Sequence, residues 1–339
     1  MKLAEQVIAG DRLALARTLS LVENDTPQGW SALDELFPHT GRAHLIGITG
    51  APGTGKSSLV NQLAYAFRHP TDGTPPLRVA VIAVDPSSPF SGGALLGDRV
   101  RMRDLAGDPG VFIRSMASRG ALGGLARHTA AVAQVFDAAG FDIILIETVG
   151  AGQGEVDIAR LAHTTIVVEA PGLGDDIQAI KAGILEIADI LVINKADRPG
   201  VEQTERALRA MLELAKPERM IMHHGRFVTF PDRTEQNEAV PGWKPFIMKT
   251  VALRGEGVQE LARAVHEHGE YLRRNSEWQR RERERLEAEL QSLLQAELMA
   301  RWQQRVPDEM YQAIFKQVFQ KTISPYQAVV KLLEQSHLF

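Results

Sequence analysis

HLIGITGAPGTGKSSLVNQLAYAF, residues 44–67, runs from an apolar stretch through a glycine-rich loop into a helical pattern. Gly50–Ser57 matches the phosphate-binding loop G-x-x-x-x-G-K-S, and it stands in the required place, after a strand and before a helix. In such a loop the glycines let backbone N–H groups turn toward a phosphate, and the helix N-terminus favours an anion. The residues predicted to bind nucleotide phosphates are Gly50, Ala51, Pro52, Gly53, Thr54, Gly55, Lys56, Ser57 and Ser58.

Short apolar runs alternate with helical patterns between residues 44 and 270. The runs are HLIGIT, RVAVIAV, VFIRS, FDIILIE, TTIVVE, ILVIN and PFIMKT. Such alternation predicts parallel strands joined by helical crossovers, because continuously apolar strands must be covered on both faces. We therefore expect an α/β fold with a doubly wound and mostly parallel sheet.

Two flanking segments differ in composition from this central domain of residues 44–270. Residues 1–43 place apolar positions at helical spacings interrupted by Gly10 and Pro27, which predicts two short helices and a loop. After about residue 270 a long charged helix is expected, followed by two short amphipathic helices, the second capped by Ser324 with Pro325 at its first position. The charged helix could pack on its own sheet, or residues 271–339 could form a partner arm.

Composition excludes several classes of function. The 339 residues include 44% hydrophobic and 24% charged side chains with a net charge of -4, which is globular and argues against a general nucleic-acid binder. No cysteine is present, so disulfides, thiolate nucleophiles, zinc fingers and iron–sulfur ligation are excluded. No apolar run is long enough to span a membrane and no signal peptide is evident, so a cytoplasmic location is expected.

FDIILIETVG predicts the Mg²⁺ side of the nucleotide site. An apolar strand that ends in Glu147 and is followed by Gly150 has the form of the element that carries the acid near the metal and the glycine that senses the γ-phosphate. The acid is Glu rather than Asp, so ligation directly and through water both stay open. A strand-end glutamate that faces solvent is the alternative.

ILVINKAD predicts the base specificity. A carboxylate in the plane of a purine can accept from both N1–H and the exocyclic amine of guanine, whereas adenine has no such pair of donors. Asp197 would take this role, Lys195 would lie over the base and Asn194 would hold the neighbouring loops. In the later segment TVALRGEGV, Ala252 could give a backbone N–H to guanine O6, although a plain strand-end turn looks the same.

At this level of detail the chain resembles the MeaB, ArgK and MMAA family of SIMIBI-class P-loop GTPases, the G-protein chaperones of adenosylcobalamin-dependent acyl-CoA mutases. The resemblance covers nearly the whole chain. It rests on GAPGTGKSS, VIAVDPSSPFSGGALLGDRVRM, LGGLAR, ILIETVGAGQGE, PGLGDDIQAIKAG, NKAD and ISPYQAVVKLLE. It implies GTP and GDP binding with Mg²⁺, a methylmalonyl-CoA-type mutase as client, and a homodimer formed through the C-terminal helices. A cobalamin adenosyltransferase is a further candidate partner.

The resemblance also assigns residues. Asp85 and Asp98 fall on the family's Mg²⁺-side and first-switch acids, which makes the implied metal set Ser57, Asp85, Asp98 and Glu147. The segment from Glu147 to Gln153 falls on the second switch. The positions that fall on the third switch, coupled to the client, are Asp175, Asp176, Gln178 and Lys181. Helix N-capping is the alternative role of the two aspartates. Departures from the family are Val100 in GDRVRM, where a threonine is common, and GQGE in the second switch.

Hydrolysis is expected to be slow. The residue after Gly150 is Ala151 rather than a water-positioning glutamine. The predicted catalytic set is Lys56, Asp98, Glu147 and Gln153. We therefore expect GTP turnover that a partner accelerates, either by ordering a switch or by supplying an arginine. The cobalamin-binding string D-x-H-x-x-G is absent from this sequence, so cobalamin is expected to belong to the partner.

Three other functions fit parts of the pattern. A metal-insertion GTPase of the HypB or UreG kind would have the same fold, but such proteins typically display cysteine and histidine ligands, and this chain has only sparse histidine pairs such as His223 with His224. A kinase would transfer the γ-phosphate to a protein or metabolite, as the ArgK name suggests. A nucleotide-gated scaffold would bind its client without meaningful turnover.

Overall fold

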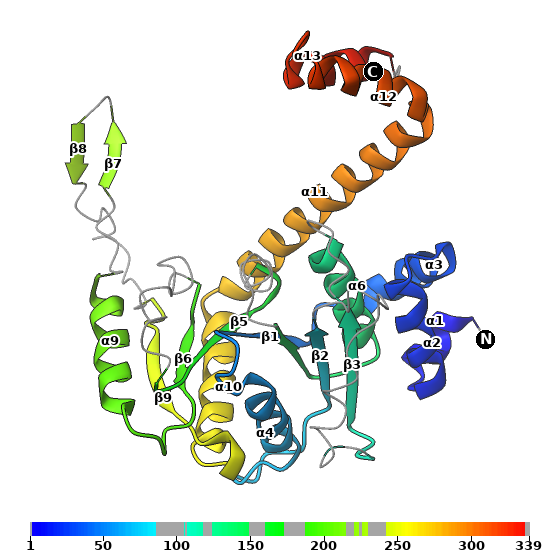
Figure 1. Cartoon of the computed structure of the whole chain (residues 1–339). Helices are drawn as coiled ribbons and strands as arrows, with labels where there is room; N and C mark the ends of the chain where they lie inside the picture. The colour runs from blue at the N-terminus through cyan, green and yellow to red at the C-terminus, as the bar shows by residue number, and fades with distance from the viewer. Residues whose placement is uncertain are drawn as a thin grey trace. The chain divides into compact units, whose positions relative to one another are not determined.

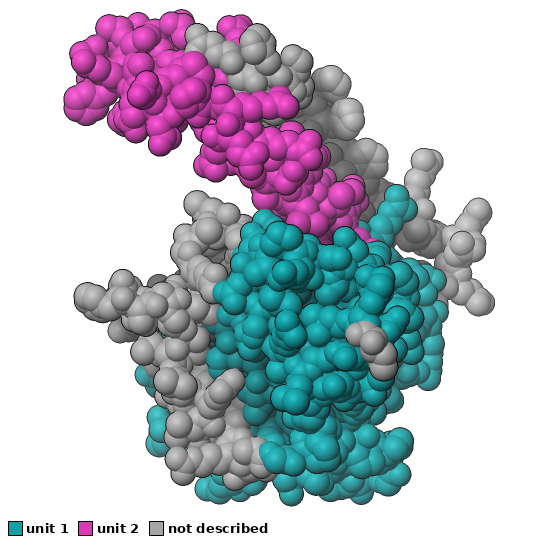
Figure 2. All heavy atoms as spheres, turned by 90° about the vertical axis from the view of Figure 1, so that its right-hand side faces the viewer, with its two compact units in different colours: residues 1–285 teal, residues 286–339 magenta. Residues whose placement is uncertain are grey.

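The computed structural model describes residues 2–85, 105, 107–117, 124–148, 160–172, 187–214, 220–223, 226–229 and 242–335. The chain divides into two compact units, residues 1–285 and residues 286–339, which Figure 2 colours separately. The boundary between the two units lies where few contacts join the residues on either side. The expected division into residues 1–43, 44–270 and 271–339 stays a prediction.

The first unit is built on a seven-stranded sheet in the order β3-β2-β4-β1-β5-β6-β9 (Figure 1). Every strand pair in this sheet is parallel, as the α/β expectation requires. The strands are β1 (His44–Thr49), β2 (Val79–Asp85), β3 (Val111–Ala117), β4 (Ile143–Glu147), β5 (Thr164–Glu169), β6 (Ile190–Ile193) and β9 (Phe246–Lys249). Sequence predicted all seven, because strands buried on both faces are apolar without interruption.

Helices cover both faces of the sheet, and alternate strand residues pack on opposite sides. Ile46 and Ile48 of β1 belong to the core that includes α4 (Lys56–Arg68) and α10 (Val258–Arg274), whereas Leu45 belongs to the core under α6 (Gly124–Ala138). A third cluster packs α9 (Val201–Leu214) on β5 and β6. This two-sided covering leaves the carboxyl ends of the strands as one shared edge, where α/β proteins bind ligands.

The amino-terminal segment differs from the expectation of two helices. It forms three helices and a short 3₁₀ turn, namely α1 (Leu3–Ile8), α2 (Arg12–Glu23), α3 (Pro27–Leu36) and η1 (Phe37–His39). Asp11 begins α2 by accepting bonds from Leu13 N and Ala14 N at 2.8 and 3.1 Å, and Thr26 begins α3 by accepting from Gly29 N at 3.1 Å. Pro27 therefore opens a helix rather than interrupting one.

Two other features were not expected. The charged helix α11 (Glu277–Arg305) begins later than predicted, because residues up to Arg274 belong to α10 and the chain turns at Asn275 and Ser276, the latter with a φ of 59°. The second is a separate two-stranded antiparallel sheet, formed by β7 (Met220–His223) and β8 (Arg226–Thr229).

The second unit has its own small apolar core. Val306, the residue after α11, is buried together with Ile314 of α12 (Asp308–Phe319) and with Ala328 and Leu332 of α13 (Pro325–Gln335). The predicted cap of α13 is confirmed, since Gln327 N donates to Ser324 Oγ at 3.1 Å. Among the residues that the structure describes, no helix combines the length and apolar character that a membrane crossing requires.

A buried histidine network lies at the amino-terminal edge of the sheet, the edge opposite the phosphate loop. His44 Nε2 lies 2.6 Å from Thr164 Oγ1, and the same hydroxyl lies 2.8 Å from Nδ1 of His268 on α10. His163 accepts a bond from Leu45 N at Nδ1, so its Nε2 carries the proton that it donates to Glu282 of α11 at 3.2 Å. The network therefore fastens the first turns of α11 to the sheet.

An ion pair completes this attachment. Arg281 of α11 binds both carboxylate oxygens of Asp189, at 2.8 and 2.9 Å, and also donates to the His163 carbonyl at 2.6 Å. Trp278 stacks on the His163 ring with 3.9 Å between ring centres. Because Asp189 directly precedes β6, these contacts tie α11 to two strands at once.

Candidate functional site

The phosphate loop joins the central strand β1 to α4 by a path that only glycine allows. Gly50 has a φ of 139°, and a Cβ there would lie 2.1 Å from the Val168 carbonyl oxygen of β5. Gly55, the residue before α4, has a φ of 92° and offers the helix no side-chain cap. The first N–H groups of α4 are thus left for an anion rather than for a capping side chain.

Lys56 lies inside this loop. Its side chain is buried, and Nζ donates to the carbonyls of Gly50 and Ala51 at 2.7 and 3.0 Å. These bonds fold the ammonium group back over the loop. A positive charge is thereby held at the concave surface where the predicted phosphates would bind.

Ser57 and Glu147 form the predicted metal corner. Ser57 Oγ donates to Glu147 Oε1 at 2.6 Å, and Glu147 is a buried residue at the end of β4, the strand that pairs directly with β1. A hydroxyl and a carboxylate are the hard oxygen ligands that Mg²⁺ takes from proteins, with water and substrate phosphates as the remainder. No group of three histidine, cysteine or acidic side chains suited to a metal is found among the described residues. The Ser57–Glu147 pair supplies two such oxygen donors, and its role as a Mg²⁺ site stays a prediction.

Asn194 connects the two halves of the site. Its Nδ2 donates to the Thr54 carbonyl at 2.9 Å, and its Oδ1 accepts from Ala252 N at 3.0 Å and from Thr250 Oγ1 at 3.2 Å. One buried amide thus ties the phosphate loop to the loop that follows β9. The sequence predicted such a role for Asn194, and these are the bonds that carry it out.

Lys195 and Asp197 stand at the other end of the site. Lys195 has a left-handed φ of 58°, uncommon for a residue with a side chain, and its Nζ donates to the Gly53 carbonyl at 2.5 Å. The Asp197 carboxylate is exposed, with Arg254 Nη1 3.8 Å away. Its oxygens are therefore accessible to a base. The Ala252 N–H expected to reach guanine O6 instead donates to Asn194 in this structure, so a bond from Ala252 to a base stays a prediction.

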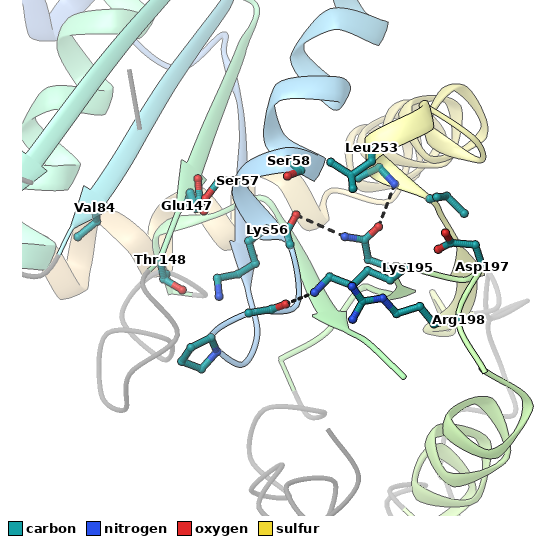
Figure 3. Close-up of a pocket in the computed structure, with 16 residues that line it drawn as sticks. Lys56, Ser57, Ser58, Val84, Glu147, Thr148, Lys195, Asp197, Arg198 and Leu253 are labelled. Carbon is teal, nitrogen blue, oxygen red and sulfur yellow. Dashed lines mark hydrogen bonds between the residues drawn. The ribbon is translucent and has the colours of Figure 1, made fainter. Parts of the chain in front are cut away.

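One cavity of about 530 Å³ collects these groups (Figure 3). The predicted residues that line it are Pro52, Gly53, Gly55, Lys56, Ser57, Ser58, Glu147, Asn194, Lys195, Asp197 and Ala252. Its volume lies within the range of ordinary ligand pockets, about 300 to 1,000 Å³. The phosphate loop, the Ser57–Glu147 pair and the Asp197 carboxylate therefore open into the same space.

Several predicted residues lie outside the described part of the chain. They are Asp98, Gly150, Gln153, Asp175, Asp176, Gln178 and Lys181. For Asp85 only the backbone is described, as the last residue of β2.

Sequence reasoning also missed part of the cavity. Val84, Arg198, Val251 and Leu253 line it without having been predicted, and Thr148, which also lines it, belongs to the predicted second switch. Each directly follows or precedes a predicted residue or a strand end, and only this neighbouring position in the sequence could have indicated that it lines the cavity. The side chains themselves carry no motif.

Comparison with known proteins agrees with this geometry. A model of the family described as methylmalonyl Co-A mutase-associated GTPase MeaB matches residues 15–306. A Pyrococcus horikoshii protein named as a GTPase is 44% identical over 334 residues, which cover 98% of this chain and 97% of that protein. The GTPase ArgK of Escherichia coli is 38% identical over 261 residues, which cover 76% of this chain and 72% of that protein.

A solved structure extends the similarity to the fold. The crystal structure of LAO/AO transport system kinase has a TM-score of 0.68 and 26% sequence identity, and it covers 98% of this chain and 95% of its own. The family match spans the sheet and every described residue of the cavity. The chain belongs to the methylmalonyl Co-A mutase-associated GTPase MeaB family.

Proposed function

We propose that this chain is a Mg²⁺-dependent GTPase whose client is an adenosylcobalamin-dependent acyl-CoA mutase of the methylmalonyl-CoA type. GTP binding and hydrolysis would gate loading of the client's cofactor and protect or reactivate the mutase. The observation that carries the GTPase part is the single cavity that holds Lys56, the Ser57–Glu147 pair and Asp197, joined across its length by Asn194. The mutase part rests on the family's description.

The chain's own groups account for binding and alignment. On nucleotide binding, the Lys56 ammonium exchanges its bonds to the Gly50 and Ala51 carbonyls for phosphate oxygens. Ser57 and Glu147 would hold Mg²⁺, which when bound neutralises charge on the β- and γ-phosphates. The Asp197 carboxylate would accept from the two adjacent N–H donors of guanine. Since phosphoryl transfer depends mainly on alignment and charge, no covalent protein nucleophile is needed.

The test is GTP turnover by the purified chain with and without a methylmalonyl-CoA-type mutase. We expect slow hydrolysis alone and faster hydrolysis with the mutase, because Ala151 stands after Gly150 in the sequence, where a water-positioning glutamine is usual. A turnover rate that the mutase leaves unchanged would contradict the client assignment. Homodimer formation and an adenosyltransferase partner belong to the same proposal, and mass measurement and co-purification test them.

A kinase is the second candidate, because the similar solved protein is named LAO/AO transport system kinase. The two functions differ in the fate of the γ-phosphate. Incubation with γ-labelled GTP and the candidate client would leave label on an acceptor for a kinase, and would release only free phosphate for a GTPase.

A further inference from the structure

The last two residues of β2 are held in the sheet from one side only. β2 lies between β3 and β4, and its pairing with β4 ends at Ala83. Val84 and Asp85 continue beyond that point, and among the described pairings they have partners only on β3, namely Met116 and Ala117. Val84 lines the nucleotide cavity, and Asp85 is a predicted Mg²⁺ ligand. The position of this strand end therefore depends on β3.

β3 is an edge strand of the described sheet, so its outer side has no strand to support it. An edge strand is fixed within its sheet by one neighbour alone. Figure 1 shows α1, α2 and α3 beside β3 and α6. Leu19 and Val22 of α2 belong to the same buried apolar cluster as Met116 of β3 and Val84 of β2. The amino-terminal helices therefore complete the support of β3.

Two arginines fasten the end of α2 to β3 and to the helix that follows it. Arg114 of β3 donates through Nε to Glu23 Oε2 at 2.9 Å, and both side chains are partly buried. Arg127, in the first turn of α6, donates through Nη2 to Asp25 Oδ1 at 2.7 Å. The same oxygen accepts from Trp30 Nε1 at 2.5 Å, and the Arg127 guanidinium lies over the Trp30 ring, 4.7 Å from its centre. Two acidic side chains at the end of α2 thus hold β3 and α6 together.

A third arginine fastens the other end of α2. Arg12 donates to the carbonyls of Pro109 and Val111 at 2.7 and 2.9 Å, and Val111 is the first residue of β3. Because Arg12 begins α2 and Glu23 ends it, the helix is attached to β3 at both of its ends. Substitutions can therefore weaken either attachment separately.

We propose that Glu23 and Asp25 are positioning residues, which hold the carboxyl end of β3 and, through it, the Val84–Asp85 end of β2. The proposal rests on the function proposed above and concerns the metal-dependent part of nucleotide binding. Neither residue lines the described cavity, so neither acts by touching the nucleotide. Removing either negative charge leaves a partly buried arginine without its charged partner, which is unfavourable. The end of β2 is then less well fixed, whereas the phosphate loop between β1 and α4 is unchanged.

The experiment measures the dissociation constant of GDP by calorimetry on the full chain, first with a chelator and then with Mg²⁺. Glu23→Gln and Asp25→Asn remove the charge and keep the size of the side chain, and asparagine accepts the left-handed φ of 56° at position 25. With the chelator, both variants should bind GDP within about twofold of the unaltered chain. The gain in affinity on adding Mg²⁺ should be smaller by about threefold in each, the size expected for one partly exposed ion pair.

Arg12→Gln is the matched control, because it removes two bonds between the same helix and the opposite end of β3. It should keep the full gain in affinity on adding Mg²⁺. Amide hydrogen exchange gives a second readout that does not depend on the metal. The amides of Val84 and Asp85 should exchange faster in Glu23→Gln and in Asp25→Asn than in Arg12→Gln.

The outcomes separate failure of the inference from failure of the proposed function. The positioning role is wrong if Glu23→Gln and Asp25→Asn gain as much affinity on adding Mg²⁺ as the unaltered chain does, or if Arg12→Gln loses as much of that gain as they do. If the unaltered chain itself gains no affinity on adding Mg²⁺, the metal part of the proposed function fails and the inference fails with it.

Discussion

Asn194 bonds to both ends of the cavity, through Thr54 on one side and through Thr250 and Ala252 on the other. Asn194→Ala removes the bonds to Thr54, Thr250 and Ala252 and leaves buried partners without hydrogen bonds, which costs about 1 to 3 kcal/mol per group. We expect a lower free energy of unfolding and at least tenfold weaker GDP binding. Denaturant titration and calorimetry measure the two effects. Asn275→Ala, which removes one amide bond to the Tyr271 carbonyl at the end of α10, should leave GDP binding intact.

Glu147 should matter for the cation more than for the nucleotide. Glu147→Gln keeps an oxygen that can accept from Ser57 but removes the charge that a divalent cation requires. We expect GDP to bind nearly as before in the presence of a chelator, and the gain in affinity on adding Mg²⁺ to be largely lost. Glu169→Gln, at the buried end of the neighbouring strand β5, should retain that gain. An equal loss in both variants would contradict a metal role specific to Glu147.

At the scale of elements, the histidine network predicts that attachment of α10 and α11 weakens in acid. Burial lowers the pKa of His268 to about 4, and it also lowers the pKa of His44 and of His163. Burial alone would raise the pKa of Glu282, but the bonds from His163 and Arg285 outweigh it and lower that pKa to about 2. The three histidines are therefore neutral, and Glu282 is charged, in the folded chain near neutral pH.

The sign of the pH effect follows from these shifts. Below pH 6.5 the unfolded chain takes up protons on histidines that stay neutral when folded, so the free energy of unfolding falls by about 1.4 kcal/mol per pH unit for each such histidine. The stabilisation is complete above pH 6.5, and the part due to His268 is lost as the pH falls toward 4. Urea titrations at pH 7, 6 and 5 measure the slope.

Two variants of α10 make this prediction specific. His268→Gln should flatten the pH slope, because it removes one buried group that titrates only when the chain unfolds. His266→Gln lies two residues earlier on the same helix, is exposed, and should leave the slope as it is. Identical slopes in both variants would show that His268 is not a source of the pH dependence.

Elements with a strong local signal were predictable from sequence, and elements set by long-range contacts were not. The seven strands and the phosphate loop carry their own apolar and glycine patterns. The break between α10 and α11 was missed because the charged pattern continues through Asn275 and Ser276. The bonds of Asn194 and the exposure of Leu253 depend on residues far away in sequence, so no local pattern could reveal them.

For the whole molecule, the division into compact units predicts that removing residues 286–339 spares nucleotide binding. The cavity residues and the three sheet cores that the structure describes all lie before Arg285, and the second unit has its own core. We expect the 1–285 fragment to bind GDP within about twofold of the full chain. Calorimetry on the two chains checks this, and a large loss of affinity would contradict it.

The same fragment tests the proposed dimer. Exposed apolar residues gather in the second unit, among them Leu290, Phe319 and Tyr326, which are 67, 80 and 77% exposed. Surfaces of this kind are typical of protein contacts. If they join two copies, the full chain should have twice the molar mass of a monomer in light scattering and the fragment should be monomeric. A dimeric fragment would place the contact elsewhere.

The hydrogen bonds of Asn194 also restrict which amino acids can replace it. Aspartate has no donor for the Thr54 carbonyl, serine is too short to reach both loops, and glutamine is longer by one methylene in a buried space. A saturation-mutagenesis survey should therefore find almost no tolerated replacement there. Intolerance to substitution at such a site reports how loops are held together, and it would be misread if it were taken as a mark of direct contact with substrate.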